Sequence, residues 1–212
     1  MLVMETIDQI AMSLSPRPDK ASHLHGYTSV YETYFAPLRS QPVRLLEIGV
    51  WEGASLELWS RVFEQGSITG MDIDLSRYDR SPERTSVVMC DQSDANALSD
   101  FGRVHGSFNI IIDDGSHMPE HQLTTFHALW PFLHPGGLFV VEDLQVNYQI
   151  RRPLMVDFLG TILQAQLHAR GFSEYAQPTT DEAALLYGRE REIEFIHLYR
   201  YLAVVRKRLS FL

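Results

Sequence analysis

The chain has 212 residues, of which 45% are hydrophobic, and its formal net charge is −9 at pH 7. This length and apolar content are sufficient for one substantial core, so we expect residues 1–212 to form a single domain. An acidic chain repels phosphate backbones, which makes nucleic acid a poor candidate partner and favours a small neutral or cationic ligand.

The cysteine content and the apolar runs indicate where the protein works. Cys90 is the only cysteine in the sequence, so no disulfide can form within the chain, as is typical of a reducing compartment. Residues 1–14 lack the cationic start and long apolar stretch of a secretory signal, and no apolar run reaches the length of a membrane span. We therefore expect a cytoplasmic protein with no membrane partner.

Short apolar strands alternate with helices along most of the chain. After a short helical start that Pro16 and Pro18 interrupt, apolar spacing predicts helices at 27–38, 54–63 and 121–133 and strands at 43–50, 67–74, 85–91, 108–115 and 136–144. Near-continuous Val, Ile and Leu in these strands favour a parallel sheet covered on both faces. Segment 145–185 interrupts the alternation with a helix at 153–169, and we expect it to cover the substrate side. Residues 191–207 predict an antiparallel hairpin.

The turn after the first strand is a candidate ligand site, because ligands bind beyond the carboxyl ends of strands in open α/β sheets. Gly49 and Gly53 would let the backbone pass close to a ligand, and Glu47 and Ser55 flank the turn. The middle glycine of the dinucleotide fingerprint is missing and acids crowd the turn, which disfavours a pyrophosphate. An ordinary strand-to-helix turn would explain the two glycines equally well.

The next two strands also end in polar residues of a suitable type. Asp72 could accept hydrogen bonds from both ribose hydroxyls of a nucleoside, whereas Asp74 fits a helix N-cap better. Asp91 or Gln92, after the third strand, could bind the amino edge of adenine. Three such strand ends together predict a nucleoside-containing cofactor.

The densest group of chemically active residues follows the strands at 108–115 and 136–144. We expect these strands to be neighbours, so that the carboxylates of Asp113, Asp114, Glu142 and Asp143 converge with the imidazole of His117. Carboxylates gathered without a counter-charge raise one another's pKa, and a divalent cation resolves that conflict. Each segment alone could be a turn or a helix cap, but both together favour a site.

Oxygen ligands favour a hard ion such as Mg²⁺. The predicted ligands are Asp114, Glu142 and Asp143, with Asp113 directed toward the cofactor. An ion there could bind two neighbouring hydroxyls and lower the pKa of one of them. His117 could then accept the proton as general base, so Asp114 and His117 are the predicted catalytic pair.

Several strings in this order resemble the metal-dependent sugar O-methyltransferases of macrolide and related antibiotic biosynthesis. They are DKASHLHGYTSVYETYF, LLEIGVWEGASLELW, GMDID, DQSD, IIDDGSH and LHPGGLFVVEDLQ. The resemblance implies a Rossmann-like methyltransferase fold, with a mostly parallel seven-stranded sheet and an antiparallel C-terminal hairpin. It also implies S-adenosyl-L-methionine as cofactor, the same three Mg²⁺ ligands, and His117 as base.

The same resemblance implies that residues 1–40 form an N-terminal lid segment, of which Asp19 to Tyr31 folds over the cofactor, with Lys20, His25 and Tyr27 as candidate contacts. Helix packing explains Tyr27 and Tyr31 equally well. Residues 146–149 differ from the family's usual Thr-Ser-Tyr-Trp, which leaves the substrate wall open. The compact size is similar to that of members acting on a short mannoside in methylmannose polysaccharide biosynthesis, and members of the family are often homo-oligomers.

Two other functions remain open from the residues alone. One is O-methylation of a catechol or other vicinal diol, which would need a flat apolar slot. We interpret Trp51, Trp59 and Trp130 as packing residues, which gives that function little support. The other is a non-catalytic cofactor-binding scaffold, although such proteins usually lose the acids and the base that are intact here.

Overall fold

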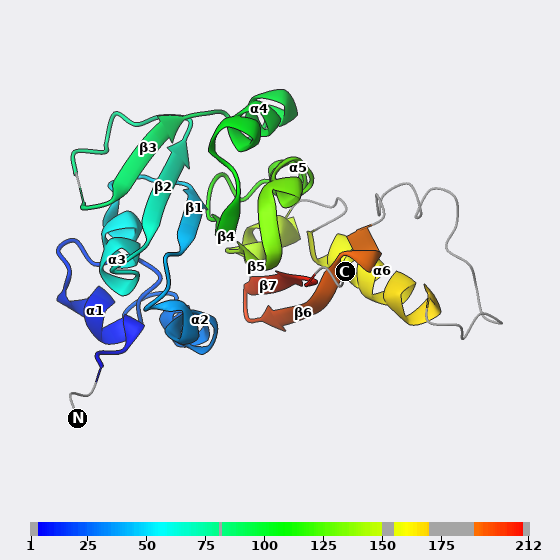
Figure 1. Ribbon diagram of the computed structural model, residues 1–212, viewed down its shortest axis with the longest axis horizontal. Coiled ribbons are helices and arrows are strands. Elements are labelled where there is room, and N and C mark those ends of the chain that lie inside the picture. Colours follow the sequence, from blue (N-terminus) through cyan, green and yellow to red (C-terminus); the bar gives the residue numbers. More distant parts are fainter. Residues whose placement is uncertain (1–3, 81, 150–154, 170–188, 210–212) are drawn as a thin grey trace.

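The computed structural model describes residues 4–80, 82–149, 155–169 and 189–209. The described strands form one seven-stranded sheet in the order β3-β2-β1-β4-β5-β7-β6 (Figure 1). The strands are β1 (Arg44–Ile48), β2 (Ser67–Asp72), β3 (Thr85–Met89), β4 (Phe108–Asp113), β5 (Leu133–Val141), β6 (Ile193–Tyr199) and β7 (Leu202–Lys207). Strands β1 to β5 pair in parallel, while β7 is antiparallel to β5 and to β6. The predicted sheet and C-terminal hairpin are confirmed.

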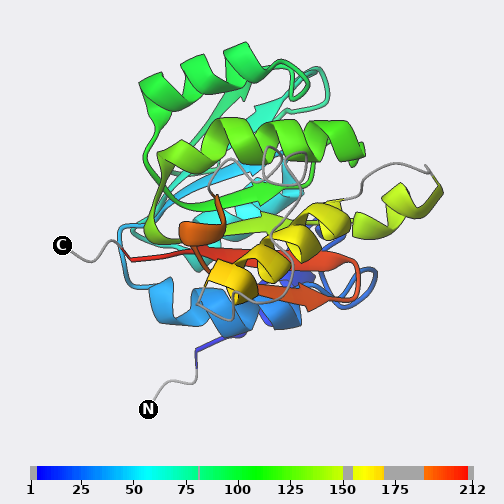
Figure 2. The same cartoon turned by 90° about the vertical axis from the view of Figure 1, so that its right-hand side faces the viewer.

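Helices cover both faces of the sheet (Figure 2). They are α1 (Ile7–Ser13), α2 (Thr28–Phe35), α3 (Ala54–Val62), α4 (Ala95–His105), α5 (Pro119–Leu129) and α6 (Met155–Ala169), with 3₁₀ turns η1 (Ala36–Leu38), η2 (Trp130–Phe132), η3 (Leu144–Gln149) and η4 (Arg189–Arg191). Residues of α1, α2 and α3 pack on one face and residues of α4, α5 and α6 on the other, which gives two apolar layers. Among the described residues, no helix has the length and apolar content needed to cross a membrane.

Helix α4 was not predicted from the sequence. Its N-cap is Asp94, whose carboxylate accepts hydrogen bonds from the backbone N–H groups of Asn96 and Ala97. Within segment 145–185, Met155, Leu159 and Ile162 of α6 are buried in the same apolar layer as α5. Residues 150–154 and 170–185 lie outside the described part, so the role of this segment over the substrate stays a prediction.

The strand register brings three strand ends to the same level. Asp113 at the end of β4 is aligned with Ile48 of β1 and with Val141 of β5. The N–H of Asp114 donates to the carbonyl of Ile48 at 2.9 Å, and the N–H of Glu142 donates to the carbonyl of Asp113 at 2.9 Å. The backbone therefore places the two acidic segments side by side, as their predicted adjacency requires.

Gly49 has a close-approach role at this level. Its φ is +93°, and a Cβ at this position would lie 2.1 Å from the carbonyl oxygen of Asp114. Only glycine fits such a contact, because a side chain would push the two strand ends apart.

Candidate active site and cofactor cleft

A cleft of about 680 Å³ opens at the carboxyl ends of strands β1 to β4. The residues that line it come from the turn after β1, the ends of β2 and β3, the loop after β4 and the N-terminal segment at 16–19. The predicted site residues on its wall are Gly49, Ser55, Asp72, Asp91, Gln92, Asp114 and His117. The cleft therefore joins the predicted cofactor turn to part of the predicted metal site.

Asp72 holds the glycine turn from the neighbouring strand. Its Oδ2 accepts hydrogen bonds from the N–H groups of Val50 at 2.7 Å and Trp51 at 3.2 Å. Its Oδ1 accepts from the N–H of Asp74 at 3.1 Å. Asp72 therefore lies fixed on the cleft wall, and its predicted contact with the hydroxyl groups of a ligand stays a prediction.

Gln92 and Asp113 form the floor that supports the loop after β4. The Gln92 amide donates to Asp113 Oδ1 at 2.6 Å and accepts from the N–H of Ser116 at 2.9 Å. Asp113 is fully buried, and burial raises its pKa to about 7 against the opposing hydrogen bonds from Gly115 and Gln92. This geometry favours a supporting role for Asp113 rather than the predicted direct contact with a cofactor.

Two more predicted cofactor residues are engaged locally. Asp91 Oδ1 accepts from the N–H and hydroxyl of Ser93, both at 2.7 Å, and this closes the turn after β3. Gly53 has a φ of +79° at the start of α3, where a Cβ would meet the Tyr78 ring at 2.6 Å. Asp91 lines the cleft, whereas Gly53 does not line it and instead allows the backbone of the turn its left-handed conformation.

Lys20 connects the N-terminal segment to three carboxylates. Its fully buried ammonium lies 3.2 Å from Glu47 Oε1 and 2.9 Å from Glu142 Oε1, and it donates a hydrogen bond to Asp114 Oδ2. Burial alone would lower the pKa of Lys20, but these acids raise it well above its ordinary value. Glu47 also accepts from the hydroxyl of Ser55 at 2.7 Å. Both Lys20 and Glu47 therefore lie in the acidic cluster behind the cleft.

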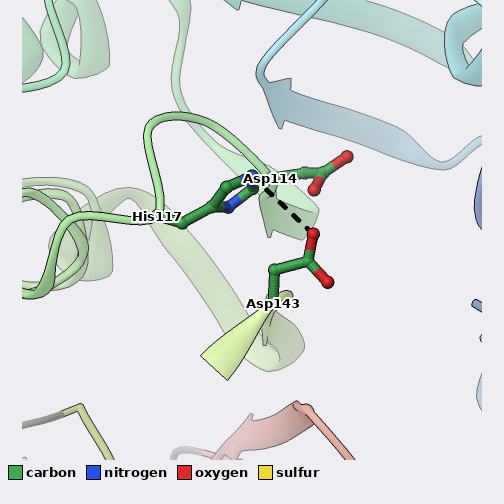
Figure 3. Close-up of side chains that lie close together, drawn as sticks. All are labelled: Asp114, His117 and Asp143. Carbon is green, nitrogen blue, oxygen red and sulfur yellow. Dashed lines mark ion pairs between the residues drawn. The ribbon is translucent and has the colours of Figure 1, made fainter. Parts of the chain in front are cut away.

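Asp143 is surrounded by four side chains at the rim of this cluster, among them Gln145, which donates to its Oδ1 at 3.0 Å. The hydroxyl of Tyr27 donates to Asp143 Oδ1 at 2.6 Å, His25 Nδ1 lies 3.6 Å from Oδ1, and His117 Nε2 lies 3.7 Å from Oδ2. Figure 3 shows the last contact, with Asp114 beside the imidazole of His117. Burial would raise the pKa of Asp143, but the hydrogen bonds from Tyr27 and Gln145 bring it below its ordinary value. Asp143 is thus a charged ligand candidate.

Two of these residues have strained backbones. His117 has a φ of 56° and Asp143 a φ of 53°, in the left-handed region that residues other than glycine rarely adopt. Each such residue costs on the order of 1–3 kcal/mol and persists only where its surroundings hold it. The two strained residues also face each other, with His117 Nε2 3.7 Å from Asp143 Oδ2, and strained residues cluster at functional sites.

The predicted metal ligands lie in two overlapping groups. Oxygen or nitrogen atoms of Asp114, His117 and Asp143 all lie within 4.8 Å of one another, and so do oxygens of Glu47, Asp114 and Glu142. Asp114 belongs to both groups, while Glu142 and Asp143 belong to different ones. The structure thus brings each of the other two ligands to Asp114, but it does not bring all three ligands together in either group.

The charge balance of the described cluster fits a cation. Three carboxylates surround the ammonium of Lys20 and a fourth, Asp143, lies at the rim, while burial together with Asp114 raises the pKa of Glu142 well above its ordinary value. Buried Glu47 Oε1 and His117 Nδ1 have no hydrogen-bond partner among the described residues. Oxygen donors with excess negative charge are suited to a hard divalent ion such as Mg²⁺.

Comparison with known proteins agrees with this geometry. Residues 46–144 match a methyltransferase domain family. The chain is 38% identical over 203 residues to 8-demethyl-8-alpha-L-rhamnosyl tetracenomycin-C 2'-O-methyltransferase from Streptomyces olivaceus, covering 88% of this chain and 51% of that protein. It is 44% identical over 137 residues to mycinamicin VI 2''-O-methyltransferase from Micromonospora griseorubida, covering 61% of this chain and 34% of that protein. The chain belongs to the same methyltransferase family as these enzymes.

A solved structure extends the comparison to the whole fold. The MycE methyltransferase of the mycinamycin biosynthetic pathway, in complex with Mg and SAH, matches 98% of this methyltransferase chain and 55% of its own, with a TM-score of 0.82 and 32% identity. A second MycE structure, with a TM-score of 0.80, also contains mycinamycin VI. The chain spans about half the length of the relatives that it matches.

Some features of this methyltransferase site were not predicted from the sequence. Tyr31 is fully buried and donates a hydrogen bond to Glu142, in addition to the packing that the sequence suggested. The interpretation of Trp51 as a packing residue is wrong, because this side chain is 62% exposed on the cleft wall and stacks on the Arg77 guanidinium at 3.9 Å. Trp59 and Trp130 are fully buried, as expected.

Proposed function

We propose that this chain transfers the methyl group of S-adenosyl-L-methionine to a hydroxyl of a sugar or glycoside, with the help of Mg²⁺. One observation carries the proposal: Asp114 and His117 lie on the wall of the cofactor cleft and meet Asp143 at its edge. Similarity to sugar O-methyltransferases supports both the reaction and the class of substrate.

The acidic residues would hold the metal ion. Asp114 and Asp143 are the candidate ligands on the side of the cleft. Glu142 lies next to Asp114, and the Lys20 ammonium forms ion pairs with both carboxylates. When bound, a divalent ion acts as a Lewis acid that orients a substrate hydroxyl and lowers its pKa. The hydrogen bond from Tyr27 holds the Asp143 side chain in position for this role.

His117 is the candidate general base. Its Nε2 would accept the hydroxyl proton, and Asp143 Oδ2, 3.7 Å away, would stabilise the resulting imidazolium. The substrate oxygen would form a bond to the methyl carbon, and the electron pair of the broken carbon–sulfur bond would stay on sulfur. Most of the acceleration would come from holding the two reactants in line.

The acceptor is proposed by class. Relatives named for rhamnosyl and mycinamicin glycosides favour a hydroxyl on a glycosidic sugar. A short mannoside, and a place in methylmannose polysaccharide biosynthesis, are narrower candidates for the same site. The homo-oligomeric state, the cytoplasmic location and the absence of a nucleic-acid partner stay predictions.

The test is a methyl-transfer assay with labelled cofactor against a panel of rhamnosides and short mannosides, in EDTA and after Mg²⁺ is restored. We expect turnover only with the metal. His117→Ala should lower kcat by about 10²- to 10⁴-fold while cofactor affinity, measured by calorimetry, stays unchanged.

His134→Ala is the matched control, because His134 is exposed on the amino-terminal half of β5, away from the strand ends that carry the site. Full turnover in EDTA would remove the metal from the reaction. Near-normal turnover in the His117 variant would show that another group takes the proton.

A further inference from the structure

The N-terminal segment forms one wall of the cofactor cleft. Residues Pro16, Arg17, Pro18 and Asp19 line the cleft together with the turn after β1. Lys20, which follows directly, is fully buried among the acids behind the cleft and does not line it. Arg17 and Asp19 are exposed, so this segment offers a bound ligand one charge of each sign.

Arg17 is the one arginine or lysine among the described residues that line the cleft. Its Nε donates to the carbonyl of Met12 at 3.1 Å, and the neighbouring Pro16 and Pro18 restrict the backbone on both sides. The two terminal nitrogens of the guanidinium make no hydrogen bond or ion pair within the described residues. A planar guanidinium held in this way is suited to bind a carboxylate through two parallel hydrogen bonds.

The start of α3 adds a second source of positive potential on the cleft wall. Gly53 is the N-cap of this helix and makes no side-chain capping hydrogen bond, while Ala54 and Ser55 line the cleft. The first N–H groups of a helix lack partners within the helix and carry a partial positive charge, which stabilises an anion. A cleft with mainly acidic walls therefore has two features that attract one anionic group.

Asp19 places a carboxylate near Asp114. Burial raises the pKa of Asp114, the charge of Lys20 opposes this effect, and the charge of Asp19 adds to it, so the two aspartates lie close together. The carbonyl of Asp19 accepts from the N–H of His25 at 3.0 Å, which fixes its backbone. The Asp19 carboxylate makes no ion pair with the described residues, so it is available to a cationic group of a ligand.

We propose that the segment at 16–19 recognises the amino-acid end of the cofactor, with Arg17 binding its carboxylate and Asp19 its ammonium. This inference rests on the proposed function, because it takes S-adenosyl-L-methionine as the ligand of the cleft. That ligand carries a carboxylate and an ammonium on one carbon, and the segment offers the complementary charges two residues apart. Arg17 and Asp19 are then specificity-determining residues that distinguish the cofactor from nucleosides without an amino acid.

The test measures four ligands by calorimetry in EDTA. They are S-adenosyl-L-homocysteine, its decarboxylated analogue, which keeps the amine, its deaminated analogue, which keeps the carboxylate, and methylthioadenosine, which has neither group. All four contain the same thioadenosine, so the nucleoside contacts cancel when a variant is compared across them. Binding without metal or acceptor keeps the result independent of turnover.

Arg17→Ala should raise the Kd of S-adenosyl-L-homocysteine and of the deaminated analogue by about 10- to 100-fold, because both contain the carboxylate. It should change the Kd of the other two ligands less than about threefold. Asp19→Asn should weaken binding only of S-adenosyl-L-homocysteine and the decarboxylated analogue, which contain the amine. Arg103→Ala and Asp100→Asn are the matched controls, since they change an exposed ion pair on α4.

An unchanged Kd of S-adenosyl-L-homocysteine in Arg17→Ala would overturn the inference, and so would an equal loss of affinity for all four ligands. If wild type binds S-adenosyl-L-homocysteine with this pattern but methylates no glycoside, the proposed function fails while the inference stands. No binding of S-adenosyl-L-homocysteine by wild type would overturn both.

A conservative variant separates charge recognition from a structural role of Arg17. Arg17→Lys keeps the positive charge but loses the planar fork, so its Kd for S-adenosyl-L-homocysteine should stay within about tenfold of wild type and below that of Arg17→Ala. A Kd in Arg17→Lys as high as that in Arg17→Ala would show that a positive charge at this position does not bind the carboxylate.

Discussion

Asp113 offers a quantitative test of the buried floor beneath the cleft. Its carboxylate is fully buried, accepts a hydrogen bond from Gln92 and has a pKa raised to about 7, mainly by burial. In Asp113→Asn the side-chain oxygen can still accept from Gln92, while the ionisable group is gone. The substitution should therefore remove a pH-dependent cost of folding and leave the local geometry in place.

The sign follows from the direction of the shift. The pKa of Asp113 is higher in the folded state than the ordinary value of 3.8, so the folded state keeps a proton that the unfolded chain releases. Wild type therefore loses stability as the pH rises from about 4 through 7, and the loss is complete above that range. The full effect is about 4 kcal/mol, and the part that falls between pH 5 and pH 8 is roughly 2.5 kcal/mol.

Urea unfolding at pH 5 and pH 8, in EDTA and without cofactor, measures this difference. The free energy of unfolding of Asp113→Asn, relative to wild type, should be higher at pH 8 than at pH 5 by up to that amount. Asp94→Asn, which changes an exposed helix cap, should show no comparable rise. A constant difference between Asp113→Asn and wild type at both pH values would refute the assigned burial and proton.

Two further substitutions test the cofactor turn. Asp72→Asn should raise the Kd for S-adenosyl-L-methionine by about 10- to 100-fold in calorimetry, because it removes a charged acceptor. Asp74→Asn, on the exposed turn, should leave this Kd unchanged. Equal Kd values for the two variants would show that Asp72 does not bind the cofactor. Gly49→Ala should lower the thermal midpoint strongly, since its Cβ would lie 2.1 Å from the Asp114 carbonyl. Gly160→Ala in α6 has space and no left-handed backbone, so it should have only a small effect, and similar midpoints would contradict the close contact.

The sequence predicted the sheet and its acidic edge because both depend on local pattern. Apolar runs mark the buried strands, and parallel strands place their carboxyl ends at one edge. From this it followed that the segments at 113–114 and 142–143 would be neighbours, and the register of β4 and β5 confirms it. Helix α4 was missed because its apolar residues are few, although Asp94 is a recognisable N-cap.

The partners within the site could not be predicted in the same way. Lys20 is 94 residues from Asp114 in the chain, and no spacing rule connects an irregular N-terminal segment to a strand end. The prediction treated the carboxylates as lacking a counter-charge, and the buried ammonium changes that premise. The left-handed backbones of His117 and Asp143 were equally hidden, because neither residue type marks such a conformation.

The buried ammonium nonetheless strengthens the case for a metal ion. Burying a lysine costs several kcal/mol unless opposite charges surround it, and stability alone would be served as well by an apolar side chain. Here one ammonium meets three carboxylates, and a fourth, Asp143, lies at the rim. The cluster stays net negative after the charge of Lys20 is counted, so a second cation would be stabilised there. The cleft beside Asp114 gives that cation access to a substrate.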